Sequence, residues 1–456
     1  MSQKPGRPKA VFTQGSTMRH VIIMTSTAAI GMMAIFFVDA VTLFYVSQLQ
    51  DPAQTAAVGR ASYVVGFVIA LAVGLMIGSS VLIARSLGEG KTKKAKSYAG
   101  SALVGVAVLG AIFSVVLLLS TNWFLARLDA QGEALDHARR YLYIILPVMP
   151  FLTVGMVSMG ILRAHGAARQ SMYITLIGGL LTATLDPIFI FVFGLEVTGA
   201  AIVSAIARIS FATYGLYLVV LVNKMAILGT LEQIKSDLAD MAKLAVPAMF
   251  TNLAAPVGAF LIAQKISEFG DAAIAGQAVV DRLIPLAFGV IFALSGAVGP
   301  IIGQNAGARL MPRARQTLID GIIFNTAYVA LAWGALFLGR NWIISIYAAT
   351  GNMALMIDLF TTIAAGAFLF NGVIFVTNAA FNNLGKPLWA TGFNWLRQTL
   401  GVVPFIWLGA EWGGLTGLSW GILAGSVPFA LIALWAAFAL IRSQTSAGSE
   451  PITART

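Results

Sequence analysis

The sequence predicts an all-α integral membrane protein with twelve transmembrane helices, arranged as two parallel six-helix repeats (an N-lobe and a C-lobe) around a central cleft. Three observations lead to this fold class. The 456 residues are 58% hydrophobic and only 10% charged, whereas a soluble domain carries about 25% charged residues. Long apolar stretches recur along the whole chain. Lysine and arginine gather in every second connection between these stretches.

The apolar stretches are long enough to cross a bilayer. A helix needs about 20 apolar residues to cross a hydrocarbon core of about 30 Å, and backbone groups at that depth must bond within their own segment, so each stretch is expected to be helical. The mean hydropathy of +0.86 agrees with this interpretation. The predicted spans are residues 19–46, 58–84, 98–121, 141–162, 171–193, 198–222, 243–267, 276–302, 316–338, 355–379, 388–409 and 414–441.

The distribution of basic residues predicts the orientation of these spans. Of the 29 lysines and arginines, twenty fall in the predicted cytoplasmic pieces or at the span ends that adjoin them, five likewise on the outer side, and four are counted within spans. Such a bias marks the cytoplasmic side of a membrane protein, so both termini are expected in the cytoplasm and the protein in the cell inner membrane as a multi-pass protein. The net charge of +11 is therefore assigned to orientation and to contact with membrane lipid, and no nucleic acid is expected as a partner.

The composition also limits the chemistry. Cysteine is absent, and no phosphate-binding Walker motif or metal-ligand spacing of histidines is present in the sequence. We therefore expect no cofactor, no bound metal and no ATP-driven step. A membrane enzyme would need a cluster of polar catalytic residues at one face, and none is visible, so the chain is not expected to be an enzyme.

The predicted domain organisation follows from the spans. A cytoplasmic N-terminal tail covers residues 1–18, the N-lobe 19–222, a cytoplasmic linker 223–242, the C-lobe 243–442 and a disordered cytoplasmic tail 443–456. Glycines recur at a nearly constant separation between the two lobes, which predicts that the second six spans repeat the first six. The pairs are Gly59 with Gly276, Gly88 with Gly307, Gly166 with Gly385 and Gly199 with Gly417, at offsets of 217, 219, 219 and 218 residues.

Two acidic residues lie deep in their predicted spans. Asp39 and Asp186 are each seven or eight residues from the outer end of the span, roughly 10–12 Å inside it at 1.5 Å per residue. A charged side chain at a helix centre costs about 2.5–3.5 kcal/mol, so such residues usually serve a transport pathway. Burial favours the protonated form of a carboxyl group, and a second nearby carboxylate favours it further. We expect Asp39 to be the main cation-coupling acid and Asp186 its partner, against the alternative that each is a hydrogen-bonded packing residue.

Several segments resemble the multidrug and toxic compound extrusion (MATE) transporter family, and the resemblance covers nearly the whole chain. They are Phe37-Val38-Asp39, Ala56-Ala57-Val58-Gly59, Leu185-Asp186-Pro187, Gly199-Ala200-Ala201-Ile202 and Gly303-Gln304-Asn305-Ala306-Gly307-Ala308. The absence of acids from the seventh and tenth spans is similar to the DNA-damage-inducible-protein-F-like branch, and this resemblance implies proton coupling. Two positions differ from the family pattern: Thr182 replaces an asparagine, and Met24 replaces a proline early in the first span.

Further site residues are expected around the two acids. Thr182 lies one helical turn before Asp186 on the same face, and the resemblance implies that Ser204 joins them; helix packing is the alternative for both hydroxyls. Met33, Phe36 and Tyr45 are candidates to line the substrate cavity, because thioethers and aromatic faces suit lipophilic cations. For these three the alternative is contact with lipid.

Together these observations predict a monomeric secondary antiporter that exports small amphiphilic organic cations in exchange for protons by alternating access. A sodium-coupled exporter of the same family is one alternative. A lipid-linked oligosaccharide flippase of the same superfamily is another, and it would have fourteen spans and a strongly cationic cavity. The partners of Asp39 and Asp186 at an offset of 218 are Val257 and Pro404, so proton handling is expected in the N-lobe alone.

Overall fold

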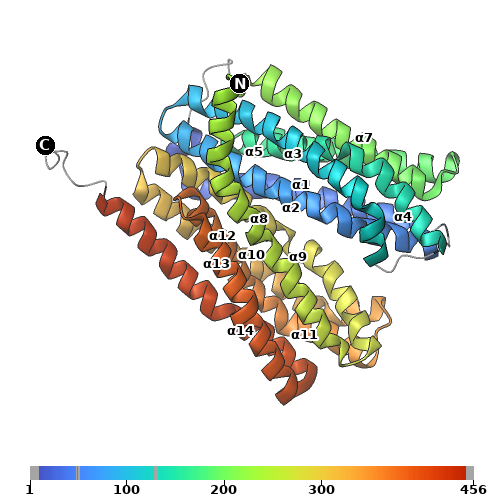
Figure 1. Ribbon diagram of the computed structural model, residues 1–456. Coiled ribbons are helices and arrows are strands. Elements are labelled where there is room, and N and C mark those ends of the chain that lie inside the picture. The colour runs from blue at the N-terminus through green and yellow to red at the C-terminus, as the bar shows by residue number, and fades with distance from the viewer. Residues whose placement is uncertain (1–9, 48, 50–51, 128–131, 448–456) are drawn as a thin grey trace, which may run out of the picture. The chain divides into compact units, whose positions relative to one another are not determined.

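The structure is a computed structural model that describes residues 10–47, 49, 52–127 and 132–447. These residues are almost entirely helical, and all twelve predicted spans fall on helices (Figure 1). In the first half the helices are α1 (Thr17–Ser47), α2 (Pro52–Gly88), α3 (Thr92–Arg127), α4 (Gly132–Ile145), α5 (Met149–Ala164), α6 (Ala168–Pro187) and α7 (Glu196–Leu216). In the second half they are α8 (Leu231–Ser267), α9 (Asp271–Gly307), α10 (Met311–Ile346), α11 (Gly351–Thr362), α12 (Ala367–Asn383), α13 (Pro387–Leu396) and α14 (Val403–Ala447).

Short non-α turns join or extend some of these helices. The predicted fourth span is α4 and α5 joined by the 3₁₀ turn η2 (Leu146–Val148), and the tenth is α11 and α12 joined by η5 (Ala364–Gly366). The π-helices η3 (Ile188–Val192), η4 (Tyr217–Val222) and η6 (Arg397–Val402) follow α6, α7 and α13. The eleventh span consists of α13, η6 and the beginning of α14, and the twelfth is the rest of α14. Gly413 and Gly414 leave helical geometry and make the turn between the two spans.

Length and apolar character agree with a membrane location. Nine helical stretches within the described residues are long and apolar enough to cross a bilayer, and one of them, Pro387–Ser446, runs through two predicted spans. Large apolar side chains such as Leu119, Leu331, Leu338 and Trp435 are more than 70% exposed. Exposed leucines on this scale are expected where the surroundings are lipid tails.

The chain divides into two compact units. One is Ile30–Met249, and the other is Ala10–Ala29 together with the described residues from Phe250 on. In the first unit, α5 contacts α2, α3 and α7, and α6 contacts α7 (Figure 1). Its cores include fully buried Leu125, Leu142 and Ile145. Glycine permits the closest approach: a Cβ built on Gly178 of α6 would lie 1.8 Å from Phe211 Cε1 of α7.

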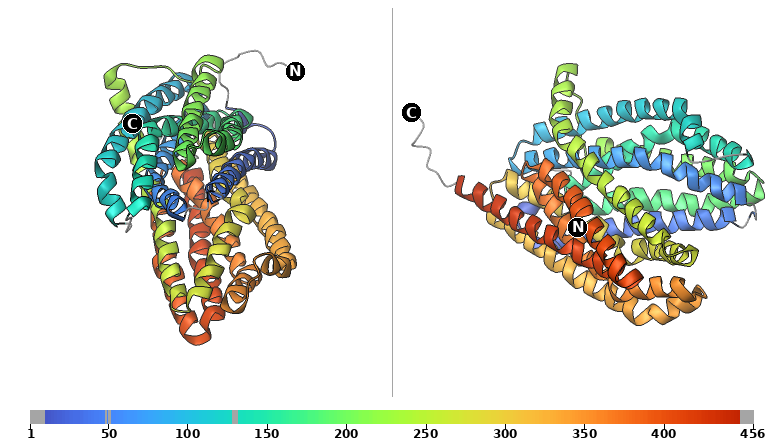
Figure 2. Two further views of the ribbon diagram at one scale, coloured as in Figure 1. Left: turned by 90° about the vertical axis from the view of Figure 1, so that its right-hand side faces the viewer. Right: turned by 60° about the horizontal axis from the view of Figure 1, so that its bottom comes forward.

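The second unit is a second helical bundle. Helix α9 contacts α10, α11 and α12, and α12 also contacts α13 and α14 (Figure 2). Its core contains the stacked rings of Phe288 and Phe368, whose centroids are 4.0 Å apart.

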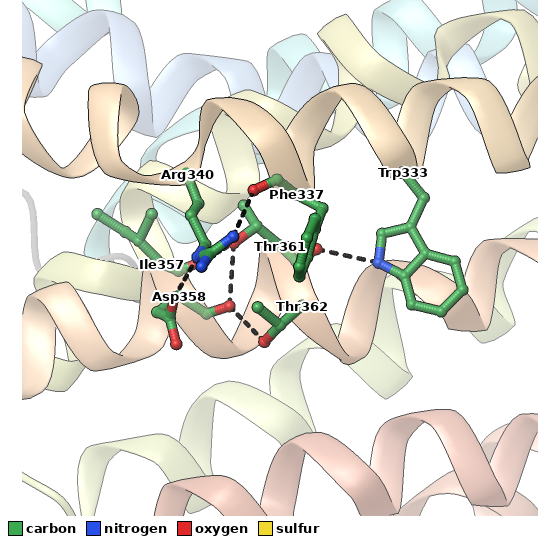
Figure 3. A network of polar contacts seen from close by, with 7 residues as sticks. All are labelled: Trp333, Phe337, Arg340, Ile357, Asp358, Thr361 and Thr362. Carbon is green, nitrogen blue, oxygen red and sulfur yellow. Dashed lines mark hydrogen bonds and ion pairs between the residues drawn. The ribbon is translucent and has the colours of Figure 1, made fainter.

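Polar contacts connect α10 to α11 (Figure 3). Arg340 Nε lies 3.4 Å from Asp358 Oδ1, and Trp333 Nε1 donates to the carbonyl oxygen of Thr361 over 2.9 Å. The Arg340 guanidinium also lies 4.5 Å from the centroid of the Phe337 ring.

The beginning of α1 and the turn before it belong to the second unit. Phe12, in the 3₁₀ turn η1 (Val11–Thr13), is 3% exposed, and its backbone N–H donates to Gln304 Oε1 over 2.9 Å. Arg313 Nη2 donates to the carbonyl oxygens of Phe12 and Gly15 at 3.1 and 2.9 Å. Thr17 Oγ1 donates to Asp320 Oδ2. Most of residues 10–18, predicted as part of a tail, are therefore held against α9 and α10.

The beginning of α8 and the segment before it belong to the first unit. The backbone N–H of Ile227 donates to the Lys96 carbonyl oxygen over 3.1 Å. The Asp237 carboxylate accepts hydrogen bonds from the hydroxyls of Ser97 and Ser101 at 2.7 and 2.8 Å. The two halves therefore exchange equivalent segments: each contributes the start of its first helix to the compact unit of the other.

The C-terminal boundary differs from the prediction. Residues 443–447, predicted as the start of a disordered tail, form the last turn of α14. Their polar side chains bond to preceding backbone carbonyls: Gln444 Nε2 donates to Leu384 O and Thr445 Oγ1 to Ile441 O, both over 2.9 Å. Short polar residues can therefore extend a membrane helix where they find backbone partners.

Candidate functional site

Asp186 is the buried acid of the first unit. It lies in the last turn of α6 with 0% of its surface exposed, and Thr42 of α1 donates its hydroxyl hydrogen to Asp186 Oδ2. A carboxylate without exposed surface requires such donors, because an unsatisfied buried charge is costly. Thr42 was not predicted as a site residue, although it lies one turn after Asp39 on the same face of α1 and that spacing could have identified it.

Helices α1 and α6 run parallel past one another. A Cβ built on Gly31 would lie 2.4 Å from Thr175 Oγ1, so glycine allows these two helices to touch. This contact and the Thr42–Asp186 bond both join residues that are 144 apart in sequence. A constant offset over three turns is the mark of parallel packing, and it aligns the Asp39 backbone with Ala183, one turn before Pro187.

The backbone of α6 changes at Asp186. Pro187 has no N–H, so the carbonyl oxygen of Ala183 loses its usual helical partner. The five residues that follow form the π-helix η3, a geometry that occurs frequently at functional sites. Helix α7 approaches this segment closely, because a Cβ on Gly199 would lie 2.7 Å from the Phe189 carbonyl oxygen. A carbonyl oxygen that lacks its usual helical partner and a buried carboxylate one turn away can bind a proton, a water molecule or a small cation.

The remaining predicted coupling residues are placed as follows. Thr182 is 6% exposed, and its hydroxyl donates to the Gly178 carbonyl oxygen over 3.0 Å. Ser204 is half-buried on α7 and makes no hydrogen bond with a described residue. Asp39 belongs to α1, but its side chain lies outside the described residues. The joint action of Asp39, Asp186, Thr182 and Ser204 therefore stays a prediction.

The three predicted cavity residues all lie on α1. Met33 is 37% exposed and Phe36 is half-buried. Tyr45 packs edge-on against Phe191 of η3, with ring centroids 5.9 Å apart. Tyr45 is thus near the segment that follows Asp186, whereas a role of these residues in substrate binding stays a prediction.

Comparison with known proteins adds to this geometry. The model of the MatE family matches residues 27–188 and, in a second match, residues 247–408. The two matches begin 220 residues apart, close to the offset of the glycine pairs. The internal repeat predicted from the glycines is thus found again by an independent measure.

Curated relatives and solved structures cover nearly the whole chain. The FAD transporter of Shewanella oneidensis is 25% identical over 409 residues, which cover 88% of this chain and 90% of that protein. The multidrug export protein MepA of Staphylococcus aureus is 23% identical over 410 residues, covering 89% and 90%. The crystal structure of the Vibrio cholerae MATE transporter VcmN in the bent form superposes with a TM-score of 0.88 at 24% identity, over 94% of this chain and 98% of that one.

The duplicated family match spans more than half of the residues, and the likeness in fold extends over almost all of them. The apolar helices are those of a multi-pass membrane protein. The chain belongs to the MatE family, the multidrug and toxic compound extrusion transporters.

Proposed function

We propose that this transporter exports amphiphilic organic cations from the cytoplasm in exchange for protons. The observation that carries the proposal is the fully buried Asp186 carboxylate, which accepts a hydrogen bond from Thr42 of the parallel helix α1. A carboxyl group in such a place binds a proton when it is shielded and releases it when it meets water on another side. Alternating exposure of this group would couple proton entry to export of the substrate.

Asp39 is the second acid of the proposal. The constant offset of 144 between α1 and α6 aligns its backbone with Ala183, between Thr182 and Asp186. We assign Asp39 the main coupling role and Asp186 the partner role, with Thr182 and Ser204 as polar neighbours. Val257 and Pro404 stand at the corresponding places of the second half, so proton handling is assigned to the first half.

The side chains around Asp186 and on α1 favour a cationic substrate with an apolar part. A carboxylate attracts a cationic head group, and Met33, Phe36 and Tyr45 offer polarisable and aromatic faces to its apolar part. One curated relative is named a multidrug export protein and the other an FAD transporter, so the family relationship is compatible with substrates of different charge. The buried acid favours a cation for this chain.

Orientation follows from the basic residues. The bias of twenty to five in the connections supports cytoplasmic termini and an inner-membrane location. Protons then enter from outside, in the direction of the usual gradient, and the substrate leaves. We propose that one chain is sufficient for transport, since both repeats are present in it.

Uptake of ethidium into inverted membrane vesicles tests the proposal. An acidic lumen should drive uptake in the wild type, and a sodium gradient of equal size should not. Asp186→Asn and Asp39→Asn each remove a titratable group with little change in size, and both should abolish the response to the pH gradient. Asp281→Asn is the matched control in the second half, because Asp281 is exposed and bonded to Gln277.

The result separates the alternatives. Uptake driven by pH in both Asp39→Asn and Asp186→Asn would overturn the coupling roles. Uptake driven only by sodium would establish the sodium-coupled alternative. Transport of a lipid-linked oligosaccharide, with no ethidium uptake under either gradient, would favour the flippase.

A further inference from the structure

Arg397 is a buried arginine without an acidic partner. It begins the π-helix η6, directly after α13, and is only 8% exposed. Its Nη1 donates to Asn371 Oδ1 of α12. Its Nε is buried, and no described residue accepts a hydrogen bond from it. A guanidinium offers five N–H donors in a rigid fork, and among the described residues Asn371 is the acceptor found for them.

No ion pair joins Arg397 to an acid in the described residues of the second unit, and several acids have partners elsewhere. The pairs are Lys265 with Glu268, Gln277 with Asp281, Arg340 with Asp358, and Thr17 and Gln316 with Asp320. Burial of an unpaired charge is costly, and intramembrane arginines that persist in this state usually face a transport pathway.

The surroundings of Arg397 are polar and neutral. One turn earlier, Asn394 Nδ2 of α13 donates to Asn378 Oδ1 of α12 over 2.9 Å. Asn371 and Asn378 are two turns apart on one face of α12, and Asn394 and Arg397 share one face of the opposing segment. The two bonds therefore form a ladder between antiparallel elements, which fixes the position of the guanidinium.

Gln398, the residue after Arg397, adds a further amide on the side of α8. Gln398 is 7% exposed, and a Cβ built on Gly258 would lie 2.1 Å from its Nε2. Glycine at 258 thus makes room for the amide. Asn371 is only half-buried, so the Arg397–Asn371 pair is not completely enclosed by the bundle.

We propose that Arg397, held by Asn371 and flanked by Gln398, binds an oxyanion group of the transported molecule. The fork of a guanidinium matches the two oxygens of a carboxylate or a phosphate, and the neighbouring amides supply further donors without competing negative charge. The substrate would then carry an anionic group in addition to its cationic one. This inference rests on the proposed export function and narrows its substrate class.

The arginine at position 397 has no counterpart in the first half of the internal repeat. At an offset of 218, Arg397 corresponds to Gly179 of α6, two turns before Asp186. The fifth span thus carries a buried carboxylate and its counterpart, the eleventh, a buried guanidinium.

Equilibrium dialysis with the purified chain in detergent tests the site without any ion gradient. Two pairs of probes differ only in the oxyanion: a fluoroquinolone with its free carboxylate against its ethyl ester, and flavin mononucleotide against riboflavin. The wild type should bind the anionic member of at least one pair five- to tenfold more tightly, and the pair concerned identifies carboxylate or phosphate as the group. Arg397→Gln should reduce that preference to less than twofold.

Three further variants keep the test decisive if Arg397→Gln does not fold. Arg397→Lys keeps the charge but loses the fork, and Asn371→Ala removes the group that orients it, so both should lower the preference in part. Lys386→Gln removes an exposed charge just before α13 and should retain the full preference. Equal binding within both probe pairs in the wild type, or an unchanged preference in Arg397→Gln, would overturn the site. A clear preference without pH-driven uptake would retain it and reject the proton exchange instead.

Discussion

Thr42 donates to the carboxylate of Asp186 at the same sequence offset, 144 residues, that separates Gly31 from Thr175, where the two helices touch. The first helix and the fifth predicted span are therefore in register over eleven residues. This register brings the hydroxyl of one helix to the carboxylate of the other. It also makes the geometry around Asp186 sensitive to changes on α1.

Thr42→Val should lower the rate of pH-driven ethidium uptake about tenfold. The substitution keeps the shape of the side chain but removes the hydroxyl that donates to Asp186 Oδ2, and a hydrogen bond to a charged group is worth about 1.5–3 kcal/mol. Thr42→Ser, which keeps the hydroxyl, should stay within about threefold of the wild type. Initial rates in inverted vesicles at several lumenal pH values measure both, and equal rates for Val and Ser at position 42 would contradict the role of the bond.

Gly178→Ala should destabilise the first unit even though alanine favours a helix. The new Cβ would lie 1.8 Å from Phe211 Cε1, and overpacking of this kind typically costs about 1–3 kcal/mol. Thermal unfolding in detergent should show a lower midpoint, and the double variant with Phe211→Leu should recover part of the loss. Gly334→Ala on α10 is the control, because nothing lies within 4 Å of its Cβ position; a loss as large for this variant would refute the packing argument.

Acidification should destabilise the protein through His165. This residue lies in the connection between α5 and α6, is 7% exposed, and has Nδ1 2.9 Å from the Ile161 carbonyl oxygen. Burial lowers the pKa of His165 to about 4, from its usual value of 6.5. The unfolded chain then binds a proton that the folded chain does not, so the stabilisation is complete above pH 6.5 and decreases toward pH 4, by about 3 kcal/mol at most.

The pH dependence of the unfolding midpoint in detergent measures this effect. His165→Gln removes the titrating group, so its midpoint should fall less between pH 6.5 and 4 than that of the wild type. Parallel curves for the two proteins over this window would show that His165 does not titrate on unfolding.

Arg313→Ala should release the chain that precedes α1. The guanidinium donates to the backbone carbonyls of Phe12 and Gly15 and to the side chain of Asn305. Without these bonds the first turns of α1 should open more often, and trypsin should cut after the exposed Arg19 at least tenfold faster. Mass spectrometry of short digests measures the cleavage. Arg315→Ala, which removes a contact with Phe438 instead, should be cut at the wild-type rate.

Much of this fold could be predicted because a bilayer imposes simple requirements. Helix number and position follow from the length of the apolar runs, and the repeat follows from glycines at loops that must turn tightly. Contacts between distant segments do not follow from such patterns. The bond of Thr42 to Asp186 depends on how α1 and α6 are rotated about their axes. A shift of one helical turn between the two helices would separate these two side chains.

The polar interior of the second half was missed for a related reason. Arg397 is recognisable in the sequence as a charge inside a span. Nothing in the sequence indicates that Asn371 and Asn378 lie beside it, because this depends on the packing of α12 against α13 and η6. Likewise, nothing in the composition of residues 10–18 indicates that Phe12 is buried. A local sequence pattern indicates the secondary structure and membrane location of a segment. The residues that it contacts depend on the tertiary structure.

The two sequence repeats and the two compact units of the structure have different boundaries. The family repeats start at residues 27 and 247, whereas the compact units also draw on residues 10–29 and 223–249 of the opposite half. A polypeptide divided after Val222 therefore yields two fragments that are each missing a piece of their own interior. The first would leave Gly100 of α3 without the Ile227 backbone that covers it. We expect neither fragment to be stable alone and the two to reassemble when they are synthesised together.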